Sequence, residues 1–345
     1  MKLRIAETLL VGCIGGLVFS VLNLPLPWML GPMAFVMIWQ GLTKRASHWP
    51  DKFKNSGLIV LGIYFGLYFT TGTFLTLSSY LIPFLLVTFL MILSSVFISI
   101  LVTKWINVDP VTSVFGSIPG GLTEMVIASE ALHAKSSYVV IFQTIRLITV
   151  LFSIPAIMLF FFSSPAETSY TTTPITATRS SYLWFVLPLL AGLFIRNRVP
   201  AGYVIGPLAV TALLQMNLSL ASVPESLLVI GQLCVGIALG KNISFSDMKA
   251  GGKYGFIYFC ISVILISLSF LFGFLLAQFT SLSLATAMLS VAPGGLIEMV
   301  LTASIVGADP AVVSALQLSR ILVILLVVPP CLTWYFRKKD RGYAA

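Results

Sequence analysis

Two short stretches, Pro119–Met125 (PGGLTEM) and Pro293–Met299 (PGGLIEM), each place a carboxylate just after a Pro-Gly-Gly break in apolar sequence. Glu124 and Glu298 fall about three residues after the break, where a carboxylate can cap the N-terminus of a following helix. Ionisable groups in apolar membrane sequence are also candidates for ion or proton coupling. Both interpretations stay open, and one residue can serve both.

Two arginines with glutamines three positions before them form a second recurring pattern, Gln143 with Arg146 and Gln317 with Arg320. Residues three apart share a helix face. A guanidinium group recognises carboxylate or phosphate by paired hydrogen bonds. Direct ligand contact and internal ion pairs with the two glutamates are equally open alternatives.

The breaks themselves predict a place where a ligand can approach the backbone. Glycine allows close approach, and the start of a following helix presents free N–H groups that suit an anion. The alternative is a packing turn that binds nothing. The predicted substrate or ion pathway comprises Pro119, Gly120, Gly121, Glu124, Gln143, Arg146, Pro293, Gly294, Gly295, Glu298, Gln317 and Arg320.

The composition predicts the environment of these residues. The chain has 345 residues, of which 58% are hydrophobic and 9% are charged, whereas soluble domains carry about 25% charged residues. Apolar runs of about 20 residues, enough to cross ~30 Å of hydrocarbon, recur along its length. We therefore expect a polytopic helical membrane protein whose first apolar run, 5–22, is a retained span and not a signal peptide.

Several functional classes lack their usual residues. The net charge is +9, but the basic residues lie in short loops beside apolar runs, so they indicate membrane topology and not nucleic-acid binding. We expect no cofactor, no metal site and no enzymatic activity, because no nucleotide-binding loop or catalytic triad pattern is present. Two histidines are isolated, and the cysteines occur singly in apolar runs, at Cys13, Cys234, Cys260 and Cys331.

The chain contains an internal repeat. A shift of 174 residues places Pro119 on Pro293, Gln143 on Gln317 and Arg146 on Arg320. We predict repeat 1 over 1–162, an external linker over 163–181, repeat 2 over 182–337 and a cytoplasmic tail over 338–345.

Each repeat holds six apolar segments, of which the fifth is interrupted by its Pro-Gly-Gly break. Asp109 and Ser283 are predicted helix N-caps, and roughly nine helical residues follow each cap, or about half the hydrocarbon thickness. These features favour a re-entrant helical hairpin over 109–135 and another over 283–309. A single kinked span is the alternative.

Basic residues distinguish these topologies. With re-entrant hairpins and a cytoplasmic N-terminus, 17 basic residues lie inside and Arg179 alone lies outside. If all twelve segments cross, the distribution is 12 against 6. The first topology fits the positive-inside rule better. It gives an all-α fold of two inverted-topology repeats, each with five transmembrane helices and one hairpin, and it places both termini in the cytoplasm.

The duplicated stretches SIPGGLTEMV…FQTIRLITV and VAPGGLIEMV…LQLSRILVI resemble the AbrB-type duplicated bacterial membrane proteins over residues 1–337. The resemblance implies a protein of the bacterial inner membrane, related to transporters. The family also carries older labels as an ammonia monooxygenase and as a regulator of gene expression. The clustered His, Cys or carboxylate ligands that a redox metal needs are not visible in this sequence.

We therefore expect a secondary transporter that moves a small metabolite by alternating access. An anionic or zwitterionic substrate and coupling to protons or sodium are further options. The alternative is a membrane sensor that influences gene expression through a partner or a metabolite level, and an embedded enzyme ranks third. The expected partners are the lipid bilayer and a small molecule or ion, without nucleic acid; a homodimer follows only from analogy with other inverted-repeat transporters.

Overall fold

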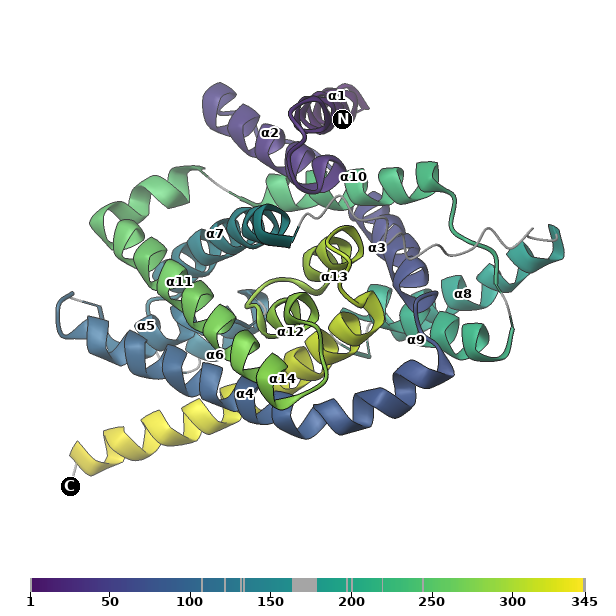
Figure 1. The fold of residues 1–345 in the computed structure, drawn as a ribbon. Coiled ribbons are helices and arrows are strands. Elements are labelled where there is room, and N and C mark those ends of the chain that lie inside the picture. The colour runs from purple at the N-terminus through teal and green to yellow at the C-terminus, as the bar shows by residue number, and fades with distance from the viewer. Residues whose placement is uncertain are drawn as a thin grey trace. The chain divides into compact units, whose positions relative to one another are not determined.

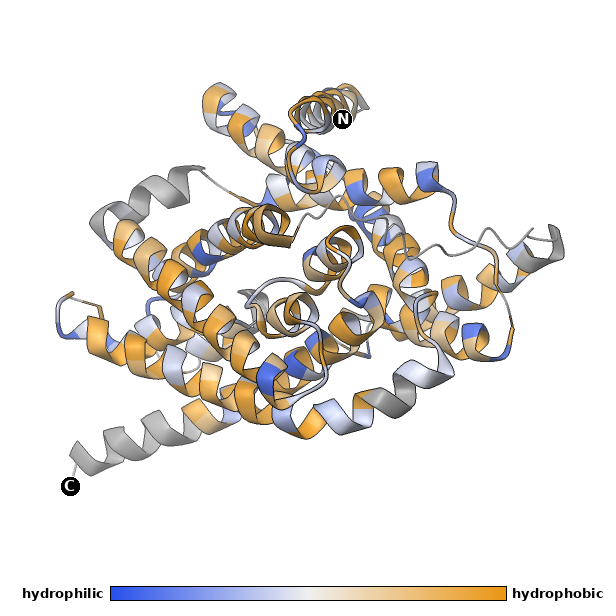
Figure 2. Ribbon diagram, viewed as in Figure 1, coloured by the Kyte–Doolittle hydropathy of each residue, from blue (hydrophilic) through white to orange (hydrophobic). Residues whose placement is uncertain are grey.

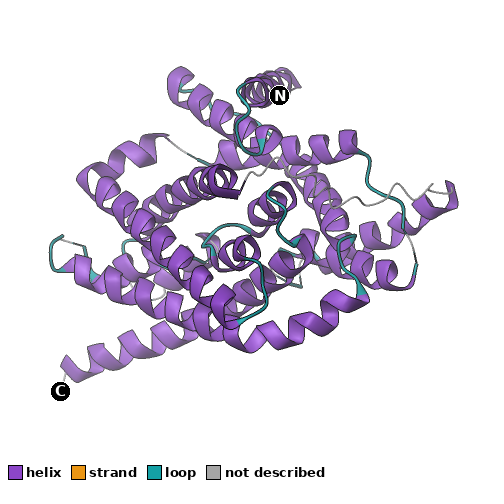
Figure 3. Cartoon of the chain, in the orientation of Figure 1, coloured by secondary structure: helices purple, strands orange, loops and turns teal. Residues whose placement is uncertain are grey.

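A computed structural model describes residues 2–106, 108–120, 122–130, 132, 134–162, 179–196, 198–199, 201–218, 220–243 and 245–343. For some helical segments, among them 122–124, 245–251 and 333–343, the structure describes the backbone only. Throughout the described ranges the chain consists of helices and the loops that join them (Figure 3). The predicted linker, 163–181, lies almost wholly outside these ranges.

Five of the described helices are long and apolar enough to cross a membrane, with candidate spans of 19 to 27 residues. At about 1.5 Å per residue, such spans match or exceed ~30 Å of hydrocarbon. Figure 2 shows hydrophobic residues along most of their length. The chain is therefore a helical membrane protein. These helices are α1 (Lys2–Val21), α4 (Thr71–Thr103), α7 (Ser136–Phe162), α11 (Phe245–Phe279) and α14 (Pro310–Tyr343).

Shorter helices connect or accompany the long ones. Between α1 and α4 lie α2 (Pro27–Thr43) and α3 (Asp51–Gly66), and between α7 and α11 lie the 3-10 helix η1 (Arg179–Phe185), α8 (Val186–Ile195), α9 (Gly202–Asn217) and α10 (Glu225–Asn242). Two broken pairs complete the chain: α5 (Pro110–Ser117) with α6 (Leu122–Glu130), and α12 (Leu284–Val291) with α13 (Leu296–Ile305) (Figure 1).

The helices repeat with the sequence. Helices α3 and α10, α5 and α12, and α7 and α14 begin 174 residues apart, the same shift that relates the two motifs. The chain divides into two compact units, and each unit draws on both sequence halves. Unit 1 comprises Met1–Ser79, Pro155–Phe245 and Val300–Val312, and unit 2 comprises Tyr80–Ile154, Ser246–Met299 and Val313–Ala345.

Unit 1 packs its helices through small residues. Helix α2 lies between α1 and α10, and α9 packs against α3 and α8. A side chain at Gly31 of α2 would collide with the backbone of Gly15 in α1, and one at Gly206 of α9 would collide with Ala191 of α8. Small residues let membrane helices approach closely and gain van der Waals contact. Gly31 and Gly206, each followed by a proline inside its helix, therefore lie at close helix contacts in unit 1.

Hydrogen bonds fix the loop after α2 to the end of α10. The Gln40 side-chain amide donates to the carbonyl oxygens of Gly240 (3.0 Å) and Lys241 (3.3 Å). The Trp49 indole N–H donates to the Cys234 carbonyl oxygen (3.1 Å), and the Lys241 ammonium donates to the Trp49 carbonyl oxygen (3.0 Å). The Gln40 bonds satisfy carbonyls at the C-terminal end of α10, and the Trp49 bonds tie the loop 44–50 to the same helix.

Unit 2 anchors its first broken helix to two long helices. The rings of Phe142 in α7 and Tyr258 in α11 are stacked, with centroids 3.4 Å apart. The Tyr258 hydroxyl donates to Ser113 Oγ of α5 (2.7 Å), and Ser113 Oγ donates to the Ser99 carbonyl oxygen of α4 (3.0 Å). A buried hydroxyl chain of this kind positions α5 by directional bonds as well as by apolar packing.

Candidate functional site

The first broken helix begins at a side-chain cap and then turns back on itself. Asp109 accepts a hydrogen bond from the Thr112 backbone N–H (2.8 Å), which confirms the predicted N-cap. After the break and α6, the Lys135 backbone N–H donates to Thr112 Oγ1 (2.9 Å). A continuous helix would separate these two residues by about 35 Å at 1.5 Å per residue. The arms of this pair therefore fold back to a common base.

The second broken helix starts in the same way. Ser283 Oγ accepts from the Thr286 backbone N–H (3.3 Å), as the sequence predicted for this cap. Both first arms are eight residues long, close to the nine expected. The first backbone hydrogen bond of α13 runs from the Met299 N–H to the Gly295 carbonyl oxygen (3.2 Å).

Gln143 and Arg146 hold the first break from α7. Gln143 Nε2 donates to the carbonyl oxygens of Phe115 (2.6 Å) and Ile118 (3.0 Å). The Arg146 guanidinium donates to the carbonyl oxygens of Ile118 and Gly120, the latter at 3.3 Å. Both side chains are buried. We refer to each Gln–Arg pair with its carbonyl partners as a carbonyl clamp.

The second clamp repeats the first bond for bond. Gln317 Nε2 of α14 donates to the carbonyl oxygens of Leu289 (2.7 Å) and Ala292 (3.2 Å). The Arg320 guanidinium donates to the carbonyl oxygens of Ala292 and Gly294 (2.8 Å), with a further bond to Val291 (3.3 Å). Apart from the Val291 bond, each donor and each acceptor lies 174 residues from its counterpart in the first clamp.

The clamps have a clear electrostatic basis. The last carbonyl oxygens of a helix lack intrahelical partners and form the negative end of its dipole. A guanidinium group offers five donors in a planar fork, so it can bond to two carbonyls and add a favourable charge there. Carbonyl oxygens thus account for the position of both guanidinium groups, and an Arg–Glu ion pair is not needed to hold them.

Each clamp also leaves one donor and one acceptor without a protein partner in the described structure. These buried atoms are Nε of Arg146, Nε of Arg320, and Oε1 of Gln143 and of Gln317. An unpartnered buried polar group costs about 1–3 kcal/mol. The same donor and the same acceptor are left without a partner in the described parts of both repeats.

The glycines of the breaks are tightly covered. A Cβ on Gly120 would meet the Met125 side chain, and one on Gly294 would meet the Met299 side chain. The Glu298 carboxylate lies against Gly295 at the start of α13, the geometry of the capping interpretation. In each break the methionine of the second arm therefore packs against the middle residue of the Pro-Gly-Gly sequence: Met125 against Gly120, and Met299 against Gly294.

The remaining candidates can be placed only in part. Pro119 and Pro293 immediately precede the clamped glycines, and Pro293 is buried. Gly121 and the Glu124 side chain lie outside the described residues, so the geometry predicted for them stays a prediction. No cluster of His, Cys, Asp or Glu with metal-ligand geometry occurs among the residues that were described.

Sequence reasoning missed Tyr258 and Ser113, which position the first broken helix. Both lie in apolar runs, and their partners are far away in sequence. The signal that was available is a hydroxyl residue within an apolar segment, which needs a hydrogen-bond partner there.

The family model described as "Transition state regulatory protein AbrB" matches residues 28–336, which include both clamps. The chain belongs to the AbrB family. It is similar to "Uncharacterized protein YhjN" of Bacillus subtilis (strain 168), at 23% identity over 93% of this chain and 90% of the relative. This AbrB-family chain is also similar to "Putative regulator AbrB" of Escherichia coli (strain K12), at 25% identity over 90% of both chains. No solved structure matches it.

Proposed function

We propose that the chain is a secondary transporter that moves a small anionic or zwitterionic metabolite past the two clamped breaks by alternating access. The observation that carries this proposal is the duplication of the clamp, with the same donors and the same carbonyl acceptors in both repeats. Broken helices that meet near the middle of the membrane are a recurring plan of substrate sites in inverted-repeat transporters.

The geometry of the first broken helix supports a re-entrant hairpin as part of this proposal. Arms of eight and nine residues are about 12–14 Å long, roughly half of the hydrocarbon thickness. The bond between Lys135 and Thr112 favours a hairpin over a kinked span because it brings the two ends of the segment together. The second hairpin follows from the repeat.

The proposed topology has five crossings in each repeat and both termini in the cytoplasm of a bacterial cell. Helices α2, α3, α9 and α10, with 16–18 residues, and the helical segment formed by η1 and α8 would cross together with the five longer ones. The basic residues then divide 17 inside to one outside, in agreement with the positive-inside rule. An odd number of crossings inverts the second repeat, so the hairpins would enter from opposite sides.

The clamps favour an anionic group on the substrate. Each guanidinium retains a buried Nε–H without a protein partner beside glycine backbone. A carboxylate or phosphate could accept that hydrogen bond and balance the positive charge. The Gln oxygen beside it could accept from a hydroxyl or ammonium group, which a zwitterion provides.

Ion coupling would involve the glutamates of the breaks. Glu298 is 5% exposed and lies at the start of α13, next to the second clamp. A carboxylate in this setting can bind a proton or a sodium ion and change the charge of the site. Glu124 would take the equivalent place in the first repeat.

The proposal can be tested by flux through the purified protein. Proteoliposomes loaded with a metabolite extract should release at least one solute that protein-free liposomes retain. Arg320→Lys should reduce this flux at least tenfold while the protein remains folded, because lysine cannot form the planar fork. A folded wild-type protein that moves no solute from the extract would refute the proposal.

The alternative function is a membrane sensor that influences gene expression, and the name of the E. coli relative, "Putative regulator AbrB", favours it. Such a protein would change transcription without moving solute. Flux through the wild-type protein separates the two functions: a transporter releases a solute from proteoliposomes, whereas a sensor releases none and still changes transcription in cells.

A further inference from the structure

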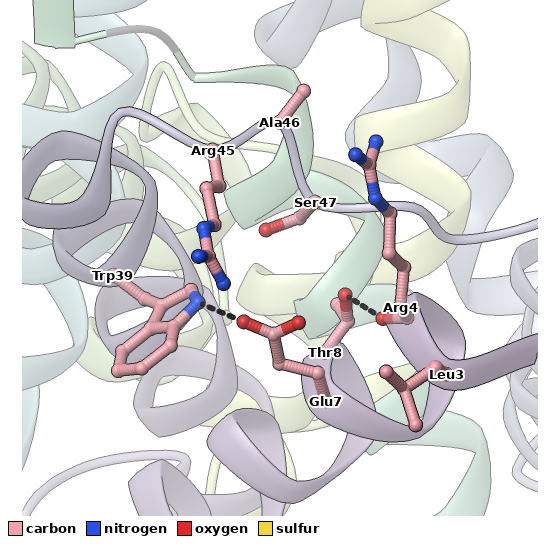
Figure 4. A pocket seen from close by; sticks show the side chains of 8 residues that line it. All are labelled: Leu3, Arg4, Glu7, Thr8, Trp39, Arg45, Ala46 and Ser47. Atoms are coloured by element: carbon pink, nitrogen blue, oxygen red, sulfur yellow. Dashed lines mark hydrogen bonds between the residues drawn. The ribbon is translucent and has the colours of Figure 1, made fainter. Parts of the chain in front are cut away.

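A polar cavity lies in unit 1. Its volume is about 330 Å³, and it is lined by Leu3, Arg4, Glu7, Thr8, Trp39, Arg45, Ala46 and Ser47. In Figure 4 the side chains of Arg45, Glu7 and Trp39 point toward one another, and Ser47 is drawn between the two arginine side chains. Neither the transport proposal nor the family description concerns these residues.

The cavity lies at the end of two membrane helices. Arg4 is in the first turn of α1, whose candidate span begins at Leu3. Trp39 is within the last turn and a half of α2 and is partly buried. Tryptophan at a helix end is typical of the headgroup region of a bilayer. The cavity is therefore expected at the depth of lipid phosphates.

The loop that carries Arg45 and Ser47 is held in place from both sides. The Ser47 backbone N–H donates to Gln40 Oε1 (3.0 Å), and the same glutamine bonds to the end of α10. Trp49 bonds to α10 as well. The positions of the two loop residues are thus set before any ligand arrives, which lowers the entropy lost on binding.

The charges and donors favour an anion with a neighbouring hydroxyl or ammonium group. Two guanidinium groups line the cavity against a single carboxylate, Glu7, whose Oε1 accepts from the Trp39 indole (3.2 Å). Among the described residues the buried Ser47 Oγ has no hydrogen-bond partner, so it can donate to a ligand. Guanidinium forks match phosphate oxygens, and a carboxylate can accept from a headgroup hydroxyl or amine.

We propose that this cavity binds the phosphate group of a bilayer lipid headgroup, with Arg4, Arg45 and Ser47 as phosphate donors and Glu7 as acceptor for the group attached to the phosphate. The alternative is that Arg4 and Arg45 are solvated charges that bind no ligand and only help to set the orientation of the helices in the membrane. The phosphate could also come from a soluble phosphate ester, which offers the same oxygens. The cavity does not depend on transport activity, so this proposal stands apart from the proposed function.

Native mass spectrometry of the full-length protein in a neutral detergent tests the proposal. The probes are short-chain phosphatidylglycerol, the matched diacylglycerol without phosphate, and glycerol 3-phosphate. Phosphatidylglycerol should bind at least about tenfold more tightly than diacylglycerol, the effect of a charge-assisted hydrogen-bonded pair. Equally tight binding of glycerol 3-phosphate would retain the phosphate site and identify its source as soluble.

A matched pair of variants separates specific binding from general attraction. Arg45→Gln should weaken phosphatidylglycerol binding about tenfold. Lys44→Gln removes the same charge from the neighbouring residue, which does not line the cavity, and should change binding less than about threefold. Should Arg45→Gln fail to fold by circular dichroism, Arg4→Gln takes its place. Equal effects at both positions, or equal binding of diacylglycerol, would overturn the proposal.

Discussion

Replacement of Arg320 by lysine tests the carbonyl clamp directly. The guanidinium group bonds to the carbonyl oxygens of Ala292 and Gly294 with separate nitrogen atoms, and the Gly294 bond is 2.8 Å long. Lysine keeps the charge but concentrates its donors on one nitrogen. It can remain bonded to Ala292, which Gln317 also supports, but it leaves Gly294 without this partner.

The expected cost follows from that one lost bond. A hydrogen bond to a charged group contributes about 1.5–3 kcal/mol, and a carbonyl left without a partner costs about 1–3 kcal/mol. Gly294 is only partly buried, so Arg320→Lys should destabilise the fold by about 1–2 kcal/mol. Arg146→Lys should cost less than about 1 kcal/mol, because the corresponding bond to Gly120 is already long at 3.3 Å.

Unfolding of the purified protein in detergent, followed by circular dichroism against denaturant, measures this difference. Both variants keep the net charge, so each serves as the control for the other. The reasoning would be wrong if Arg146→Lys were destabilised as much as Arg320→Lys, or if neither differed from the wild type.

Three further outcomes test local features. Asp109→Ala should cost about 0.5–2 kcal/mol through loss of the cap bond, whereas Asp109→Asn should cost little because its side-chain oxygen can still accept, and denaturant unfolding would show the difference. Gly31→Ala should cost about 1–3 kcal/mol by forcing α2 away from Gly15, whereas Gly72→Ala, whose Cβ would make only an ordinary contact with the Thr70 side chain, should change stability by less than about 0.5 kcal/mol in the same assay. Trp49→Phe should lose about 1 kcal/mol with the indole bond to α10, and faster hydrogen exchange over the loop 44–50 would report it.

Features that depend on neighbouring residues were predictable from the sequence. The caps at Asp109 and Ser283 follow from residue type and the helix that comes after them, and the structure places both as expected. The break between α5 and α6 follows from proline and glycine in the same way. The membrane class follows from composition, which needs no knowledge of contacts.

The partners of the arginines were not predictable. Arg146 and Arg320 were expected to contact a ligand or a glutamate, whereas the structure bonds both to backbone carbonyls some 26–29 residues earlier. Every residue carries a carbonyl group, so sequence offers no signal for which one is used. Arg4 and Arg45 were interpreted only as topology signals, because their shared cavity depends on the packing of α1 against α2.

The two compact units also had no counterpart in the sequence. A sequence repeat shows that two segments share an ancestor, but it does not show which helices contact each other. The structure groups α1–α3 with α8–α10, so that each unit contains parts of both repeats. Such grouping depends on contacts such as Gly62 with Val204, which join positions far apart in the chain.

The inverted orientation of the two hairpins is the central claim, and cysteine labelling from one side of the membrane tests it most directly. In a variant without native cysteines, Lys135→Cys places an exposed thiol after the second arm of the first hairpin, and Ile305→Cys places one at the last residue of the second arm of the second hairpin. An impermeant thiol reagent added to intact cells should label position 305 and reach position 135 only after the membrane is opened. Labelling of both positions from the same side would contradict the inverted repeat and the pathway proposed between its breaks.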